Sequence, residues 1–147
     1  MKRRLLVPAW GRIAILALSA TAHSGAQNAV ETDSEGVYTL EQARRGERIY
    51  RQQCSACHRD DLLGNTVDGG PPLRGLPFTT RWQGLGIATL LEMVEEFMPA
   101  GAPGSLGRQE YVDVLSFVLW ANGVPAGEVE LPASSAALAS IVLHFEP

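Results

Sequence analysis

Cysteine is scarce in this chain: among 147 residues there are two, and both lie in the segment Cys54-Ser55-Ala56-Cys57-His58. A structural zinc site would need two further thiol or imidazole ligands at matching spacing, and the sequence does not offer them. A thioredoxin-like redox pair would follow a strand in an alternating pattern of strands and helices, which is also missing. Thiol redox chemistry and metal binding are therefore the weaker interpretations of this cysteine pair.

The spacing Cys-x-x-Cys-His is the one at which haem becomes covalently attached to a protein. Two thiols on one turn of backbone add to the two vinyl groups of the porphyrin, and the adjacent imidazole becomes the fifth ligand of the iron. We therefore predict one haem c, attached through Cys54 and Cys57, with His58 as an iron ligand.

A long apolar run is missing as well, because residues 13–20 form an apolar stretch too short to span a bilayer. Four basic residues precede this stretch and small residues follow it, as in a secretory signal peptide; they are Lys2, Arg3, Arg4 and Arg12. We expect residues 1–22 to be the signal, with a second acceptable cleavage site after Ala26. A retained membrane anchor is the weaker alternative. Export to the bacterial periplasm agrees with the haem motif, because haem is attached covalently outside the cytoplasm.

Positive charge is scarce once the signal is removed. The segment 1–22 contains four of the twelve basic residues and none of the sixteen acidic ones, so the remainder carries a net charge of −8. Such a surface disfavours nucleic acid and anionic lipid as partners. It suits a protein partner with a basic docking patch, and it equally suits a protein that only has to stay soluble.

The remaining length of about 125 residues indicates one domain with a modest core. Residues 23–36 are mostly small, polar or acidic and predict a flexible lead-in. We place the folded domain at 37–123 and treat 124–147 as a C-terminal extension. Within that extension, residues 133–143 have the apolar spacing of a short helix that could lie on the domain.

The first helix should begin at Thr39, with Gln42 reaching back from three residues on. One stripe of residues then recurs at steps of three and four and predicts the buried face: Leu40, Ala43, Gly46, Tyr50, Cys54 and Cys57. Glu41 with Arg45 and Glu47 with Arg51 are spaced for ion pairs on a solvated face. Gly46 inside a helix indicates a close crossing with another helix.

The partner in that crossing is predicted at residues 108–121, which have an apolar face and stop before Gly123. Phe117 is expected to fill the space that Gly46 leaves. A third helix is predicted at 89–97, where Thr89 and Glu92 can form a capping box. The stretch 64–86 is rich in glycine and proline and predicts a loop over the haem edge.

Few side chains outside the signal can supply a sixth iron ligand: Met93, Met98, His144 and, depending on cleavage, His23. Met98 precedes Pro99 at the end of a predicted helix, where a turn can present its thioether to the iron. Met93 lies in mid-helix, where methionine is more often a core residue. His144 lies in the extension and is expected to be a surface or packing residue. The residues thus favour Met98, with Met93 as the alternative.

From about Glu41 to Gly123, the chain resembles a class I c-type cytochrome. Gly46 and Tyr50 resemble the glycine and the aromatic residue of that family's N-terminal helix, which cross an aromatic residue of the C-terminal helix, here Phe117. The resemblance implies an all-α fold, in which the N- and C-terminal helices cross and loops close around one covalently attached haem.

The segment Gly70-Pro71-Pro72-Leu73-Arg74-Gly75 resembles the Gly-Pro-x-Leu-x-Gly loop of the same family. The resemblance implies that Leu73 contacts the haem and that the Pro71 carbonyl accepts a hydrogen bond from the second ring nitrogen of His58. A metal-bound imidazole needs such a partner in any case, because the bond fixes its tautomer and orientation. The family's Met-Pro pattern after the haem motif also selects Met98.

Trp82 resembles the aromatic residue that many family members place near a haem propionate, where its indole N–H can donate a hydrogen bond. Ordinary packing beneath the loop is the alternative for this side chain. Arg74 or Arg81 is a candidate to neutralise a propionate, and a solvent-exposed position is the alternative for each.

Ligation by histidine and methionine implies single-electron transfer by cycling between Fe(II) and Fe(III), with no open position for oxygen or peroxide. We therefore expect an electron-transfer protein of the respiratory chain rather than an enzyme. Its expected partners are redox proteins: a dehydrogenase, a quinol-oxidising complex or a terminal oxidase. A free carrier would be a monomer.

The Pro-Ala-Gly segments after Met98 and after Val124 are similar to cytochrome modules that accompany periplasmic quinoprotein dehydrogenases, which oxidise alcohols or sugars. The alternative is therefore a haem subunit bound tightly to such an enzyme. An apolar, exposed extension would favour the bound subunit, and an extension that covers its own domain would favour the free carrier. An enzyme in its own right is a third possibility, which would require Met98 to be absent from the iron.

Overall fold

The structure is a computed structural model that describes residues 30–31, 36–65, 67 and 69–146. The predicted signal peptide, 1–22, and most of the predicted lead-in, 23–36, lie outside the described residues. Within the described part, no helix is long and apolar enough to cross a membrane.

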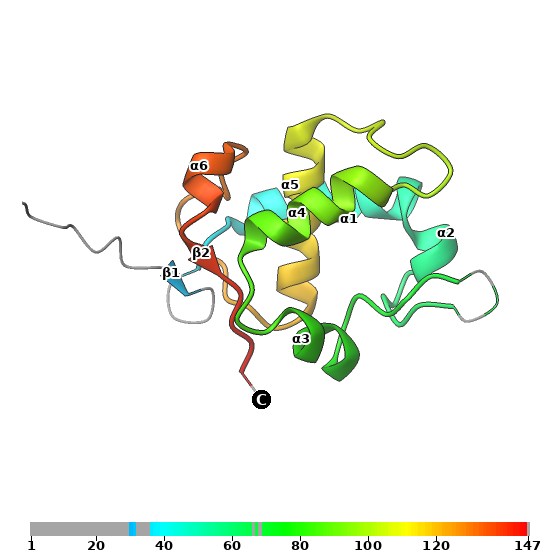
Figure 1. Cartoon of the computed structure of the whole chain (residues 1–147), viewed down its shortest axis with the longest axis horizontal. Helices are drawn as coiled ribbons and strands as arrows, with labels where there is room; N and C mark the ends of the chain where they lie inside the picture. Colours follow the sequence, from blue (N-terminus) through cyan, green and yellow to red (C-terminus); the bar gives the residue numbers. More distant parts are fainter. Residues whose placement is uncertain (1–29, 32–35, 66, 68, 147) are drawn as a thin grey trace, which may run out of the picture.

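The described chain is mostly helical, as predicted. Its helices are α1 (Leu40–Gln53), α2 (Ser55–His58), α3 (Leu76–Trp82), α4 (Ile87–Phe97), α5 (Arg108–Ala121) and α6 (Ser135–Leu138). Two short strands, β1 (Val30–Glu31) and β2 (Ile141–Val142), pair in parallel and join the two ends of the described chain. Figure 1 shows α1 and α5 crossing at the centre of the molecule, with α4 beside them.

Helix α1 begins where the sequence predicts, because the Thr39 hydroxyl accepts a hydrogen bond from the backbone N–H of Gln42 at 3.1 Å. The predicted hydrogen bond from the Gln42 side chain back to Thr39 is not formed. The Gln42 side chain instead forms hydrogen bonds with the backbone of Leu131. Ala43, Gly46 and Tyr50 are buried as predicted. Leu40 is 38% exposed, so its assignment to the buried face is wrong.

The crossing of α1 and α5 is closest at Gly46. A Cβ at this position would overlap the backbone carbonyl of Asp113, so only glycine permits the approach. The prediction for Phe117 is corrected: its ring does not fill the space at Gly46 but packs one turn further on, 5.2 Å from the ring of Tyr50. Helix α5 has the predicted bounds, and Gly123 follows it with a φ of 84°.

Only one of the two ion pairs predicted on α1 from the four-residue spacing is present. Arg51 pairs with Glu47 at 2.7 Å, as predicted. Arg45 pairs with Asp113 of α5 at 3.0 Å and with Glu130 of the extension at 2.8 Å, so the predicted pair with Glu41 is wrong. Asp113 is buried, and a bidentate arginine compensates the cost of burying its carboxylate.

The stretch 64–86 is not entirely loop, because its second half forms α3. Pro77 stands in the first turn of that helix, where a missing N–H costs nothing. Helix α4 then begins at Ile87, two residues before the prediction, with Gly86 as its N-cap. The capping box expected at Thr89 and Glu92 is therefore wrong.

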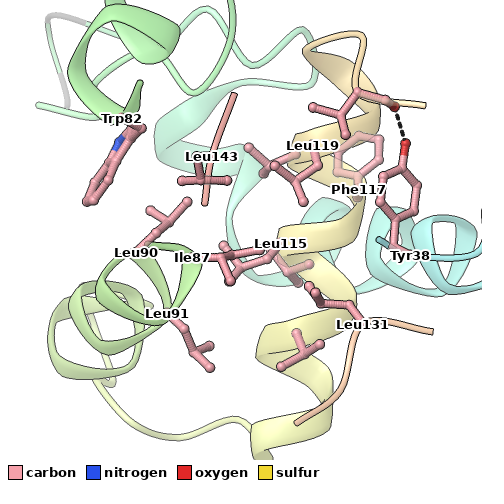
Figure 2. Close-up of a cluster of buried hydrophobic side chains, with 14 of the residues drawn as sticks. Tyr38, Trp82, Ile87, Leu90, Leu91, Leu115, Phe117, Leu119, Leu131 and Leu143 are labelled. Atoms are coloured by element: carbon pink, nitrogen blue, oxygen red, sulfur yellow. Dashed lines mark hydrogen bonds between the residues drawn. The ribbon is translucent and has the colours of Figure 1, made fainter. Parts of the chain in front are cut away.

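The C-terminal extension lies on its own domain. Its predicted helix is limited to the four residues of α6, which Ser134 caps, and β2 follows. Large apolar side chains of the extension are buried: Leu131, Leu138, Ile141, Leu143 and Phe145. Figure 2 shows Leu131 and Leu143 among side chains of α4 and α5 in one continuous core.

We predict that Gly46→Ala lowers the free energy of unfolding by more than about 2 kcal/mol, although alanine is the better helix former. The reason is the overlap of the new methyl group with the Asp113 carbonyl. Gly101→Ala is the matched control, since nothing lies within 4 Å of a Cβ at that position. Denaturant unfolding of both purified variants measures the difference, and equal stabilities would contradict the close crossing.

Candidate functional site

The two cysteines and His58 lie on one turn of backbone at the end of α1. The Cys54 N–H donates to the carbonyl of Tyr50 at 2.8 Å, and the Cys54 carbonyl accepts from the N–H groups of Cys57 and His58 at 3.2 and 3.0 Å. Both thiols are partly buried, and His58 is 5% exposed. The fold thus presents two thiols and an imidazole together.

The ring of His58 has a fixed orientation. Its Nδ1 lies 2.8 Å from the carbonyl oxygen of Pro71, the contact that the loop resemblance implies. A carbonyl can only accept, so Nδ1 carries the proton and Nε2 keeps its lone pair. The imidazole is therefore prepared to bind a metal through Nε2.

The loop that carries Pro71 is held against the turn of His58. The N–H of Gly64 donates to the His58 carbonyl at 3.1 Å, and the N–H of Leu73 donates to the Leu62 carbonyl at 2.8 Å. Gly70 lies so close to Cys57 that a Cβ there would overlap the Cys57 carbonyl. The loop position thus depends on glycine at residue 70.

Two further residues support the site in ways that local sequence patterns do not reveal. The Asn122 amide donates to the Leu73 carbonyl at 2.9 Å and accepts from the Gly75 N–H at 3.0 Å, which holds the loop from the end of α5. The Tyr50 hydroxyl donates to the Arg59 carbonyl at 2.7 Å, and burial raises the pKa of this phenol. Tyr50 thereby fixes the backbone position of Arg59, the residue that follows His58.

A cavity of about 450 Å³ adjoins the turn, and every site residue predicted from the sequence lines it: Cys54, Cys57, His58, Pro71, Leu73, Trp82 and Met98. Most of the remaining wall is apolar and comes from α3, α4 and α5; it includes Phe78, Leu90, Val94, Val114, Leu115 and Val118. An apolar chamber with two thiols and an oriented imidazole fits a haem, whose large ring needs such surroundings.

Both methionines line the cavity, whereas His144 does not. Met98 ends α4 in extended conformation, and its N–H donates to the Val94 carbonyl at 2.9 Å. The Met98 carbonyl accepts from the Tyr111 hydroxyl at 2.7 Å and from the Gly104 N–H at 3.2 Å. The backbone of Met98 is therefore anchored on both sides, partly by α5.

The structure separates the two arginines considered for a propionate. Arg81 lines the cavity, and its guanidinium lies 5.6 Å from the ring centroid of the buried Trp82. Arg74 instead lines a separate groove with Gly75 and Asn122. Arg81 is therefore the better placed of the two.

The thiol chemistry of the pair differs from that of a redox-active dithiol. Burial, and secondly the neighbouring Cys57, raise the pKa of the Cys54 thiol to about 11. Reactive cysteines have lowered pKa values, because the thiolate is the nucleophile. Among the described residues, no group of three histidine, cysteine or acidic side chains could hold a metal ion, which leaves the zinc interpretation without ligands.

Comparison with known proteins agrees with the geometry. Residues 41–118 match the model of a family described as cytochrome c oxidase, cbb3-type, subunit III. The chain belongs to this family. It is therefore a c-type cytochrome, and its cofactor is one haem c attached covalently through Cys54 and Cys57.

Two curated relatives are thiosulfate dehydrogenases. The chain is 35% identical over 78 residues to the one from Stutzerimonas stutzeri (strain A1501), which covers 50% of this chain and 25% of that protein. It is 34% identical over 95 residues to the one from Allochromatium vinosum (strain ATCC 17899), which covers 61% of this chain and 33% of the relative. The chain thus spans a quarter to a third of these proteins.

A solved structure shows the same fold. The sulfane dehydrogenase SoxCD from Paracoccus pantotrophus matches 91% of this chain and 67% of its own matched chain, with a TM-score of 0.52 and 22% identity. At that identity the likeness concerns the fold alone. The family match, rather than this structure, makes the protein an electron-transfer cytochrome.

We predict that Gly70→Ala lowers the stability of the holoprotein by more than about 2 kcal/mol, since the methyl group would push the loop away from Cys57. The loosened contact between Pro71 and His58 should also lower the yield of protein with covalent haem. Quantifying haem per chain and unfolding the variant beside Gly101→Ala checks both effects. Unchanged haem content and stability would contradict the role of this loop.

Proposed function

We propose that this cytochrome carries single electrons between redox proteins in the bacterial periplasm, with His58 and Met98 as the side chains that would hold the haem iron, and without catalysis of its own. The haem iron, when bound, supplies a one-electron couple between Fe(II) and Fe(III). The observation that supports the proposal is the gathering of Cys54, Cys57, an oriented His58 and Met98 around one apolar cavity.

Met98 is a better candidate than Met93 for the second residue that would hold the iron, because its backbone is fixed from outside its own helix. The Tyr111 hydroxyl of α5 donates a hydrogen bond to the Met98 carbonyl, which fixes the backbone position from which the Met98 side chain extends at the cavity wall. Met93 lies inside α4, where its backbone follows the helix. A thioether ligand favours ferrous iron and raises the reduction potential.

The absence of catalysis follows from this ligation. With two protein ligands, the iron would have no open position for oxygen, peroxide or another substrate. The curated relatives are named as enzymes, but the part that this chain matches is a quarter to a third of their length. We therefore assign electron transfer to this chain.

The extension favours a freely diffusing carrier over a permanently bound subunit. Leu131, Leu138 and Leu143 are at most 1% exposed, so these three leucines of the extension pack within its own domain. The second candidate is a haem subunit of a dehydrogenase. The names of the curated relatives make a dehydrogenase of inorganic sulfur compounds the first such partner to test, before an enzyme that oxidises alcohols or sugars.

We predict that Met98→Ala abolishes the ferric absorption band of a methionine-to-iron bond and lowers the reduction potential. Met93→Ala is the matched control and should keep the band, because Met93 is a partly buried packing residue whose loss affects stability more than ligation. Absorption spectra and redox titrations of both holoproteins decide between the two. Retention of the band in Met98→Ala and its loss in Met93→Ala would assign the ligand to Met93.

We predict that the protein, followed by its covalent haem in a native periplasmic extract, elutes at its own small mass during size fractionation. Such elution is the behaviour of a diffusible carrier. Co-elution with a large dehydrogenase would establish the bound subunit instead, and the substrate of that dehydrogenase would give the pathway. A haem signal confined to the membrane fraction would contradict export as a soluble protein.

A further inference from the structure

The C-terminal extension, of which residues 124–146 are described, lies outside the segment that matches the family. Figure 1 shows its last part running beside α3, the helix that contributes Phe78 and Trp82 to the cavity wall. A helix of seven residues has little stability of its own, so neighbouring contacts must hold α3 in position.

Backbone hydrogen bonds join the extension to the residues that follow α3. The N–H of Gly84 donates to the Leu143 carbonyl at 2.7 Å, and the N–H of Leu143 donates to the Leu85 carbonyl at 2.8 Å. Leu143 itself is fully buried. The turn from α3 into α4 is therefore paired with the extension.

Side chains continue this contact up to the cavity. The side-chain amide oxygen Oε1 of Gln83 accepts a hydrogen bond from the Phe145 N–H at 2.9 Å. The Phe145 ring meets Phe78 edge to face at 5.9 Å, and Phe78 in turn lies 6.4 Å from Trp82. Phe145 does not line the cavity itself, but it packs directly behind two residues that do.

The other end of the extension is fastened to the helix crossing. Gln42 of α1 exchanges two hydrogen bonds with the backbone of Leu131, at 3.0 and 2.7 Å. Arg108 of α5 donates to the Ala133 carbonyl at 2.6 Å and also holds Glu95 of α4. The extension thus links α1, α4 and α5 to the back of α3.

We propose that the C-terminal extension, through Phe145 and Gln83, is a positioning element that presses α3 onto the haem and keeps water away from its ring. The inference rests on the proposed electron-transfer function. A drier haem environment favours the ferrous state and raises the reduction potential. A closed wall also limits the access of small ligands to the iron.

The test uses the full-length holoprotein and imidazole, which binds ferric iron when the sixth ligand leaves. Phe145→Ala should bind imidazole about tenfold more tightly, because the apparent affinity follows the fraction of molecules in the open state. The same variant should have a lower reduction potential than the wild type. Val129→Ala is the control, since Val129 belongs to the extension but is 74% exposed, and both quantities should stay unchanged.

Phe145→Leu should restore most of the wild-type behaviour, because leucine still fills the space behind Phe78. If Phe145→Ala does not accumulate as holoprotein, Gln83→Ala provides the test. Gln83 is exposed, so its loss removes the side-chain bonds to Phe145 and His144 of the extension without emptying the core, and a smaller change in the same direction is expected. A variant that is less stable but has wild-type potential and imidazole affinity would overturn the proposal and leave the extension a structural role only.

The two proposals fail in different ways. A wild-type protein without the methionine-to-iron band would refute the ligation by Met98. The difference in potential between wild type and Phe145→Ala would still test the extension, because it depends on α3 and on water near the ring rather than on the sixth ligand.

Discussion

The close approach of α1 and α5 at Gly46 is the constraint on which the rest of the structure depends. The backbone of α1 touches the Asp113 carbonyl there, which a side chain would prevent. From that point α1 continues directly into the turn with Cys54, Cys57 and His58, while α5 continues with Val114, Leu115 and Val118 along the cavity. The distance between the haem-binding turn and the wall facing it is therefore set by one glycine, and the Tyr50 to Phe117 contact one turn on maintains it.

Polar contacts around the cavity act mainly on backbone. Pro71 holds the ring of His58, Tyr50 holds Arg59, and Tyr111 holds Met98, each through a carbonyl oxygen. This arrangement leaves the chamber itself apolar while its lining residues keep fixed positions. In so short a chain, a covalently bound haem also completes a core that the protein alone would fill poorly. Geometry and cofactor thus support each other, and a wall of fixed lining residues suits the transfer of electrons through a bound haem.

The sequence predicted the features that local spacing determines. The haem motif could be predicted because its residues are contiguous in the sequence. Helices α1 and α5 could be predicted because their apolar residues recur every three or four positions. Helix α3 was missed because glycine and proline around it conceal any helical period. The contacts of Gln42 with Leu131, of Arg45 with Glu130 and of Asn122 with Leu73 could not be predicted, since they join residues 49 to 89 positions apart. Such pairs have no local signature, and the role of the extension depends on them.

The most direct test of the account is the haem content of the purified protein, measured by intact mass and by the spectrum of its pyridine complex. The account predicts one haem per chain that resists acid extraction and gives the c-type spectrum of a porphyrin whose vinyl groups are both saturated. Haem that can be extracted, or a haem-free chain with a disulfide between Cys54 and Cys57, would contradict it.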